Sequence, residues 1–301
     1  MSYKVEVDFA PMYECITSLN AFLWKQNHNA MDAGKLWVRE VQERFAPRLL
    51  QQMREIISIT DDLSLSPYVW SCPGDRSVSG FLDWFDALSP GELYEIAGRF
   101  GQSVPSNLGD LRSTASEILR QWDAGYFSGI DPRIVAGLQQ EADSRRLQLN
   151  GDNDMEVYEQ ATEGMRLYPA ERLKQVIIIP QYHSRPLVSS SMYDEFVFTS
   201  YSFDAIPPEE GRPAPALMRL TRALSDETRL FILRLLSGEQ LNFTEIVKEV
   251  GLSKSTIHYH LIALRAAGLV IVHTSGKSTS YSLRPEALTS LPERIAAYLK
   301  D

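Results

Sequence analysis

The segment Ser253 to Gly276, SKSTIHYHLIALRAAGLVIVHTSG, limits the possible folds of this chain more than any other part of it. Ile257, Leu261 and Leu264 stand at i, i+4 and i+7, so a helix here would bury them on one side. Gly268 supplies the left-handed residue that commonly ends a helix, and an apolar run follows it. The pattern predicts a helix with one packed side, a sharp stop and then a strand.

The opposite side of this helix carries mainly short or hydrogen-bonding side chains and no carboxylate. Because a carboxylate would repel phosphates, this side is suited to contact with a polyanion. The alternative is an ordinary solvated helix face. The residues of this side and its flanks are Ser255, Thr256, His258, Tyr259, Ile262 and Ala266.

A shorter helix is predicted just before it. Phe243 to Val250 has its apolar residues at helical spacing, Gly251 and Leu252 form a short turn, and the Ser253 hydroxyl caps the next helix. Two short helices joined in this way form a helix-turn-helix. In such a unit the second helix enters the major groove of DNA and its N-terminal residues reach base edges.

A two-stranded wing is predicted after the helix-turn-helix. Leu269 to Thr274 and Ser278 to Leu283 alternate or run apolar, and Ser275-Gly276-Lys277 between them predicts a hairpin turn that carries a cation. We expect the tip of this wing to lie beside phosphates.

The segment from Leu224 to Leu283 resembles the winged-helix domain of the ArsR family of bacterial transcriptional regulators. Three ordered motifs carry the resemblance, SDETRLFILRLL, LSKSTIHYHLIALRAAGLV and GKSTSYSL, and all lie within the last 85 residues. The resemblance implies a homodimer that binds an imperfect palindrome in double-stranded DNA near a promoter, usually as a repressor that a ligand releases.

Within this motif eight residues are predicted to contact DNA. Arg265 and Lys277 are expected to contact phosphates, so that their loss would lower affinity and salt dependence without changing sequence preference. His260 is angled toward the packed side, and Arg229 is expected to have a structural role near Asp226. The predicted DNA-binding residues are Ser253, Lys254, Ser255, Thr256, His258, Tyr259, Arg265 and Lys277.

The last helix carries an apolar stripe. Such a stripe is commonly part of a core, but a terminal helix that follows a wing often pairs with its twin, which predicts dimerisation. The stripe consists of Leu291, Ile295, Tyr298 and Leu299.

No metal or cofactor is expected. Metal-sensing relatives in the ArsR family place cysteines in the first helix of the helix-turn-helix, or histidines and carboxylates on the C-terminal helix. Here Asn242 to Val250 contains no Cys and Thr289 to Lys300 contains no His, so thiolate and imidazole ligands are missing at both places.

The charge of the chain is segregated. The net charge is -9, but from Leu217 to Asp301 there are 11 Lys and Arg against 8 Asp and Glu, which gives +3 and leaves -12 for the rest. A weakly basic C-terminal module is compatible with phosphate contacts, whereas the acidic remainder should face away from DNA.

The first two-thirds predict a mostly helical domain that ends in a small β-sheet, so the chain is of the α+β class. Ile206 to Pro215, IPPEEGRPAP, predicts an extended linker. We therefore expect a regulatory, effector or dimerisation domain at 1–206, a linker at 207–215 and the winged helix-turn-helix at 216–301. Predicted helices include 32–59, which Pro47 kinks or divides, and 154–168; predicted strands include 175–180, 195–201 and 185–191.

The cellular setting is predicted from what the sequence lacks. It has no apolar run of about 18 residues and no signal-peptide pattern, so we expect a cytoplasmic protein without a membrane span. Cys15 and Cys72 are the only cysteines and are expected to be buried thiols.

These patterns favour a sequence-specific DNA-binding regulator, with an N-terminal domain that senses a small-molecule effector other than a metal or binds a partner. Two alternatives stay open: a winged helix used for protein contact, and an enzyme that its winged helix localises. Neither alternative has a positive sequence feature behind it. For the enzyme, the chain lacks a phosphate-cradling glycine loop, HExxH, GxSxG and CxxC.

Overall fold

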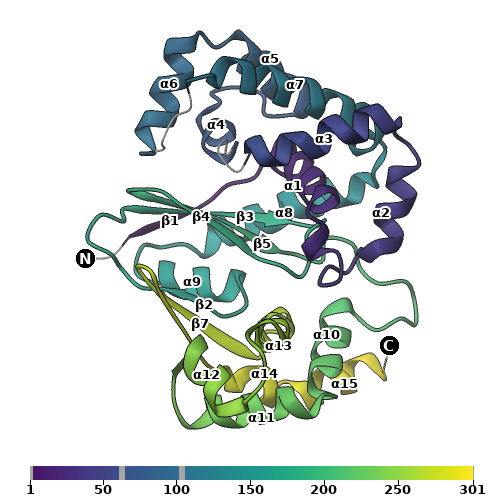
Figure 1. Cartoon of the computed structure of the whole chain (residues 1–301). Coiled ribbons are helices and arrows are strands. Elements are labelled where there is room, and N and C mark those ends of the chain that lie inside the picture. The colour runs from purple at the N-terminus through teal and green to yellow at the C-terminus, as the bar shows by residue number, and fades with distance from the viewer. Residues whose placement is uncertain (1–2, 61–64, 102–105, 301) are drawn as a thin grey trace. The chain divides into compact units, whose positions relative to one another are not determined.

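In the computed structural model, which describes residues 3–60, 65–101 and 106–300, the chain forms two compact units. The N-terminal unit comprises residues 3–147 and 172–205. The C-terminal unit comprises residues 148–171 and 206–300. Figure 1 labels the helices and strands of both units.

The N-terminal unit is built on a four-stranded sheet of β1 (Lys4–Val7), β3 (Gln175–Gln181), β5 (Phe196–Ser202) and β4 (Ser189–Met192), in the order β1-β3-β5-β4. β3 pairs in parallel with β1 and β5, and β4 is antiparallel to β5. Residues 176–179 in the middle of β3 (Val-Ile-Ile-Ile) are almost wholly buried, as is typical of a central parallel strand that is covered on both faces.

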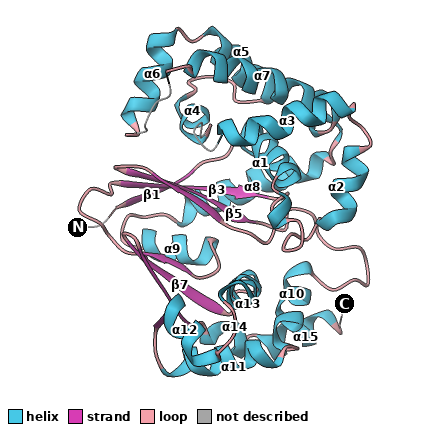
Figure 2. Cartoon of the chain, viewed as in Figure 1, coloured by secondary structure: helices cyan, strands magenta, loops and turns pink. Residues whose placement is uncertain are grey.

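Helices cover both faces of this sheet (Figure 2). Alternate residues such as Ile177, Ile179 and Phe198 face the large helical layer and belong to its core. On the other face α8 lies against the sheet. There the Tyr201 hydroxyl of β5 donates to the Glu141 carboxylate of α8 at 3.2 Å. The α-helices of this unit are α1 (Pro11–Leu23), α2 (Gly34–Gln42), α3 (Pro47–Thr60), α4 (Ser66–Ser71), α5 (Val78–Ala87), α6 (Pro90–Arg99), α7 (Leu108–Gly125) and α8 (Pro132–Gln148), with short 3-10 turns η1 (Lys25–Asn27) and η2 (Phe127–Gly129).

The helical layer packs around aromatic rings. Trp122 is fully buried, stacks on Phe45 at 5.4 Å between ring centroids, and donates its indole N–H to the Ser18 hydroxyl at 2.9 Å. This bond joins α7 to α1 through the core, and a buried indole donor needs such a partner. Both cysteines are buried free thiols, as predicted.

The C-terminal unit contains α10 (Pro215–Leu224), α11 (Glu227–Gly238), α12 (Phe243–Val250), α13 (Lys254–Ala266), α14 (Pro285–Thr289) and α15 (Leu291–Tyr298). Its wing is the antiparallel pair β7 (Val270–Ser275) and β8 (Ser278–Leu283). β6 (Leu241–Asn242) pairs with β8, and β2 (Met165–Leu167) pairs with β7 in parallel, so the sheet order is β2-β7-β8-β6.

The arm formed by residues 148–171 was not expected in this unit. We predicted a helix over 154–168 and placed it in the N-terminal domain, but α9 (Asp154–Ala161) ends early and β2 follows it. Gly164 causes the change, because its φ of +111° cannot continue a helix, and its carbonyl accepts from the Val272 N–H at 2.8 Å. This segment therefore packs with the winged helix, although it lies before the linker in sequence.

Other boundaries agree more closely with the sequence. The predicted helix over 32–59 is divided, because Pro47 starts a new helix at α3, where it needs no N–H partner. Pro215, the last residue of the predicted linker, is the first residue of α10. The α+β class is confirmed. None of the helices in the described ranges combines the length and the apolar character that crossing a bilayer requires.

Candidate nucleic-acid interface

The turn between α12 and α13 is fixed by its caps. Asn242 and Glu245 form a reciprocal capping box at the start of α12, in which each side chain accepts from the other residue's backbone N–H. Gly251 ends α12 with φ +75° and donates its N–H to the Val247 carbonyl at 3.0 Å. A residue with a side chain rarely adopts this conformation, so glycine sets the sharp turn into α13.

Ser253 is the N-cap of α13, as predicted. Its hydroxyl accepts from the Thr256 N–H at 3.2 Å and also lies 2.9 Å from the Ser255 hydroxyl and 2.8 Å from the Thr256 hydroxyl. These three hydroxyls form one exposed cluster at the start of the helix. Because the Ser253 hydroxyl is used to cap the helix, the exposed Ser255 hydroxyl is the better placed of the two to bind an external partner.

The N-terminal half of α13 has the two sides that the spacing predicts. Ile257, Leu261 and Leu264 are buried in the C-terminal core. On the other side the side chains of Lys254, Ser255, His258 and Tyr259 are exposed, and Thr256 is half-buried. Tyr259 is 56% exposed, which is high for an aromatic residue and leaves more than half of it accessible to a groove. Farther along, Ala266 is buried and Ile262 is half-buried, so the exposed surface is limited to the first half of the helix.

The start of α13 differs in charge from the starts of its neighbours. α11 and α12 each carry an acidic residue in the first turn, Glu227 and Glu245, where the helix dipole favours a negative charge. α13 has no acidic residue there and begins with exposed Lys254. Positive charge at this end opposes the dipole unless an anion lies beside it, which suits the approach of a phosphate.

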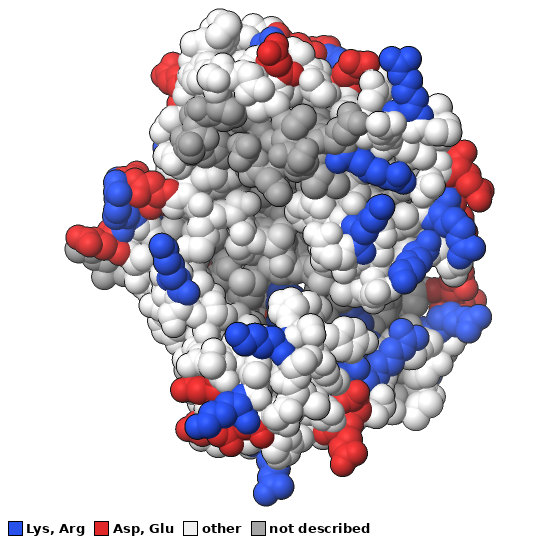
Figure 3. Space-filling model, in the orientation of Figure 1, with Lys and Arg blue, Asp and Glu red and all other residues white. Residues whose placement is uncertain are grey.

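The tip of the wing presents a second cation. Gly276 turns the hairpin with φ +55°, and Lys277 next to it is exposed, like its neighbours Ser275 and Ser278. On the face shown in Figure 3, basic and acidic side chains are interspersed. Affinity for a phosphate backbone would therefore depend on a few placed cations.

His260 and Arg229 are structural, as predicted. The His260 side chain is buried on the packed side of α13, and its Nδ1 lies 3.7 Å from the Asp226 carboxylate. Asp226 caps α11 by accepting from the Arg229 N–H at 3.0 Å, and the Arg229 guanidinium donates to the Arg222 carbonyl at 2.9 Å. This cluster fixes α13 against α11.

Comparison with known proteins agrees with this geometry. The family profile described as "Bacterial regulatory protein, arsR family" matches residues 226–272. The chain is 29% identical over 91 residues to the nodulation protein NolR of Rhizobium meliloti, a match that covers 30% of this chain and 75% of NolR. It is 36% identical over 67 residues to the transcriptional repressor SdpR of Bacillus subtilis, covering 22% of this chain and 74% of SdpR.

The chain belongs to the ArsR family. Among solved structures it is similar to an ArsR-like transcriptional regulator from Rhodococcus sp. RHA1, with 32% identity, a TM-score of 0.26, and coverage of 28% of this chain and 83% of that one. The family profile and the similarity to SdpR identify the protein as a DNA-binding transcriptional regulator, and its ArsR-type reader is the winged helix of the C-terminal unit.

Arg265 corrects one prediction about this ArsR-type reader. We expected it to contact phosphate, but its guanidinium is partly buried and donates to the Thr162 carbonyl in the arm at 2.9 Å. Burial lowers its pKa to about 10, although the nearby Glu163 carboxylate acts in the other direction. A guanidinium committed in this way is not available to DNA, so Arg265 is a structural residue.

The arm makes further contacts that sequence reasoning missed. Tyr168 stacks on His273 of β7, with its hydroxyl 3.0 Å from Nδ1, and the Ser282 hydroxyl lies 2.8 Å from Nε2. Burial, and then the positive charge of Arg166, lower the pKa of His273. The glycine at 164 was the available sequence signal, since it marks the end of a helix and permits close approach of a strand.

The C-terminal stripe is divided by the structure. Leu291 is half-buried and packs against the core of the C-terminal unit. Ile295, Tyr298 and Leu299 are 37%, 36% and 75% exposed, which leaves an apolar surface on and just beyond α15. Within the described ranges no group of three or more His, Cys, Asp or Glu side chains is placed to hold a metal ion.

Proposed function

We propose that this regulator acts as a homodimeric repressor that binds an imperfect palindrome, and that its N-terminal unit senses a small molecule other than a metal, or a partner protein. The observation that carries the DNA-reading part is the exposed, carboxylate-free first half of α13. Lys254 at the start of this helix and Lys277 at the wing tip add two exposed cations that suit phosphates.

The roles of the reader residues follow from their chemistry. Ser255 and Tyr259 present hydrogen-bonding groups suited to base edges, and His258 beside them can reach either a base or a phosphate. Lys254 and Lys277 supply phosphate contacts, which position the helix without reading sequence. The net charge of +3 over residues 217–301 supports this division of roles.

A homodimer would give this reader its specificity. Two recognition helices held about one helical turn of DNA apart read two half-sites, so the dimer fixes the operator spacing. The exposed apolar residues Ile295 and Leu299 supply a surface that a second copy would cover. SdpR, to which the reader is similar, is described as a transcriptional repressor, which supports the proposed sign of regulation.

Chain connectivity supports a sensing role for the N-terminal unit. The chain crosses from one unit to the other after residues 147, 171 and 205. Within the described residues the units are therefore joined by three connections, of which the predicted linker is the third. β2, in the wing sheet, ends at Leu167, and β3, in the N-terminal sheet, begins at Gln175. A ligand that shifts the N-terminal unit between two states could therefore act on the wing through this short connection.

Selection of genomic DNA fragments by the full chain, across a salt series, tests the proposal. We expect enrichment of a palindromic site whose affinity falls as salt rises, and Tyr259→Phe and Ser255→Ala should relax base preference at defined positions. A double variant in which Lys254 and Lys277 are both alanine should instead weaken binding to all sequences. If the affinity for DNA did not depend on salt and stayed unchanged in all these variants, the winged helix would instead be a protein-contact module.

A further inference from the structure

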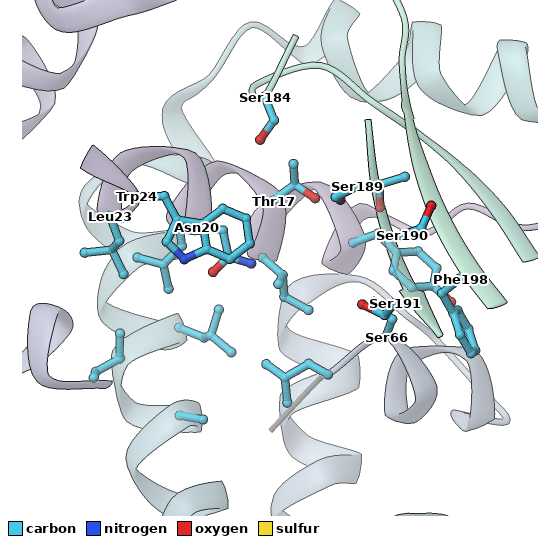
Figure 4. A pocket seen from close by; sticks show the side chains of 18 residues that line it. Thr17, Asn20, Leu23, Trp24, Ser66, Ser184, Ser189, Ser190, Ser191 and Phe198 are labelled. Atoms are coloured by element: carbon cyan, nitrogen blue, oxygen red, sulfur yellow. The ribbon is translucent and has the colours of Figure 1, made fainter. Parts of the chain in front are cut away.

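A cavity of about 310 Å³ opens within the N-terminal unit, between α1, α7 and the β4–β5 edge of the sheet. Its volume is at the low end of the roughly 300–1,000 Å³ of small-molecule sites. Figure 4 shows Thr17, Asn20 and Trp24 on the helix side of this cavity, and Ser189, Ser191 and Phe198 on the strand side.

The helix side of the cavity is set by the periodicity of α1. Nine of the 13 residues of α1 are buried, and apart from Pro11 at its start the partly exposed ones are Ile16, Thr17 and Asn20. All three line the cavity, and Trp24, just past the helix end, continues the same stripe. The surface that α1 leaves uncovered is therefore the cavity wall.

The strand side is set by the alternation of β4 and β5. Ser189 pairs with Ser200 and Ser191 pairs with Phe198, so these four side chains share one face of the sheet. Phe198 assigns that face to the side of the helical core. Ser190 also borders the cavity, and its hydroxyl lies 3.0 Å from that of Thr199.

These walls carry hydrogen-bonding groups that the fold does not use. Among the residues that the structure describes, none forms a side-chain hydrogen bond with Thr17, Asn20, Trp24, Ser189 or Ser200. By contrast, the buried Glu14 next to the lining residue Tyr13 is paired: it accepts from the His183 N–H at 2.9 Å and lies 2.5 Å from the His183 Nδ1. That pairing also fixes the loop that brings Ser184 to the cavity rim.

The remaining wall is mainly apolar, and the lining residues that the structure describes are uncharged. Leu23, Ile118 and Leu119 form part of the apolar surface, and within residues 3–60, 65–101 and 106–300 no Asp, Glu, Lys, Arg or His lines the cavity. A charged ligand would lose its hydration here without an opposite charge in return, which is costly. A wholly apolar ligand would leave the amide of Asn20 and the indole N–H of Trp24 without partners.

We propose that this cavity binds an uncharged small molecule with an aromatic or aliphatic body and one edge of hydroxyl, carbonyl or amide groups. The inference rests on the proposed sensing function and names the chemical class of the effector. The body lies against α7 and Leu23, and the polar edge faces Asn20 and the serines of β4 and β5.

The first test uses the full chain and two fluorescent probes with closely related ring systems. N-phenyl-1-naphthylamine is neutral, whereas 8-anilino-1-naphthalenesulfonate carries an added sulfonate. We expect saturable binding of the neutral probe with an affinity at least about tenfold higher than that of the anionic one, equivalent to roughly 1.4 kcal/mol. Equal affinities for the two probes would overturn the proposal.

Blocking variants locate the binding. Thr17→Phe and Ser191→Phe place a ring in the cavity from opposite walls. We expect each change to lower the affinity for the neutral probe at least about tenfold. Met192→Phe is the matched control, because Met192 is the next residue of β4, is 54% exposed and does not line the cavity. Circular dichroism verifies that each variant is folded. If both blocked variants bind the probe like the control, the proposal fails.

The polar edge is tested by displacement of the neutral probe. We expect 2-naphthamide to displace it at lower concentration than 2-methylnaphthalene, and Asn20→Leu to reduce that difference by severalfold. An unchanged preference in Asn20→Leu would refute the assigned orientation.

DNA measurements separate this inference from the function on which it rests. If the probe binds in the cavity but operator affinity is unaffected, the cavity assignment holds and the sensing role is lost. If an operator is selected but neither probe binds at the cavity, the ligand site is refuted and the DNA-reading role stands.

Discussion

The guanidinium of Arg265 donates to the carbonyl oxygen of Thr162 at 2.9 Å, which ties the recognition helix α13 to an arm about a hundred residues earlier in the chain. Thr162 is itself fixed, because its hydroxyl donates to the Tyr158 carbonyl at 2.7 Å and accepts from the Met165 N–H at 3.2 Å. The arm thus supports the C-terminal half of α13, whereas the residues that we propose to read DNA lie in its N-terminal half.

Replacement of Arg265 by alanine should therefore affect stability. We expect a loss of roughly 1–3 kcal/mol in the free energy of unfolding, because the Thr162 carbonyl would lose its charged donor in a buried setting. The slope of log affinity for DNA against log salt should stay as in the wild type. Urea denaturation and DNA titration of the full chain measure the two quantities, and a changed slope with unchanged stability would return Arg265 to the phosphate contacts.

Lys277→Ala should have the opposite signature. Lys277 is exposed at the wing tip, so its loss should leave the unfolding midpoint in place and lower the salt slope by about 1. Base preference should not change, since a phosphate contact carries no sequence information. A matched titration with Lys300→Ala, a cation outside the wing and recognition helix, serves as the control.

The contrast between these two basic residues shows how far the sequence could predict the site. The burial of Ile257, Leu261 and Leu264 and the capping by Ser253 depend on neighbours within one or two helical turns, so periodicity and local chemistry predicted them. The environment of Arg265 depends on Thr162, and no local pattern relates the two residues. On sequence alone an arginine on a recognition helix looks like a phosphate contact.

The fold shows the same division. Helix positions in the N-terminal unit followed from apolar spacing and from Pro11 and Pro47, both of which start helices. The parallel pairing of β1 with β3 joins residues about 170 positions apart, and β2 has only three residues, too few for an alternating pattern. Pairings of this kind depend on the assembled core, which the sequence pattern does not display.

The docking of the arm can be tested at Gly164. A Cβ there would lie 2.8 Å from the Val270 carbonyl oxygen, and φ is +111°. Gly164→Ala should lower the free energy of unfolding by roughly 1–3 kcal/mol and speed hydrogen exchange of the Val272 amide. Gly151→Ala is the control, since Gly151 also has a positive φ, +87°, but open space around it. Equal effects of the two changes would mean that backbone strain alone, and not the close approach of β7, explains the loss.

His273 makes stability depend on pH. Burial lowers its pKa in the folded state below the ordinary value of 6.5, so folding favours the neutral ring. The contribution of His273 to the free energy of unfolding is complete above about pH 6.5 and is lost as the pH falls toward the lowered pKa. The unfolding midpoint in urea should therefore drop between pH 7.5 and 5. In His273→Gln the drop should be smaller, and an identical pH profile would show that other groups cause it.

The apolar surface of α15 yields the last prediction. Ile295 and Leu299 are 37% and 75% exposed, and covering them with a second copy would remove their apolar area from water. A carboxylate buried there without a partner is costly, so Ile295→Asp and Leu299→Asp should each raise the dimer dissociation constant by about thirtyfold or more, equivalent to the roughly 2 kcal/mol of an interface hot spot. Sedimentation and light scattering of the full chain measure this constant. DNA affinity should fall as the dimer dissociates, because a monomer reads one half-site.

Leu36→Asp is the control, since Leu36 is a leucine of α2 that is 67% exposed on the N-terminal unit. A dimer that survives both α15 changes but dissociates in Leu36→Asp would move the interface to the N-terminal unit, and would leave recognition-helix spacing to be set there.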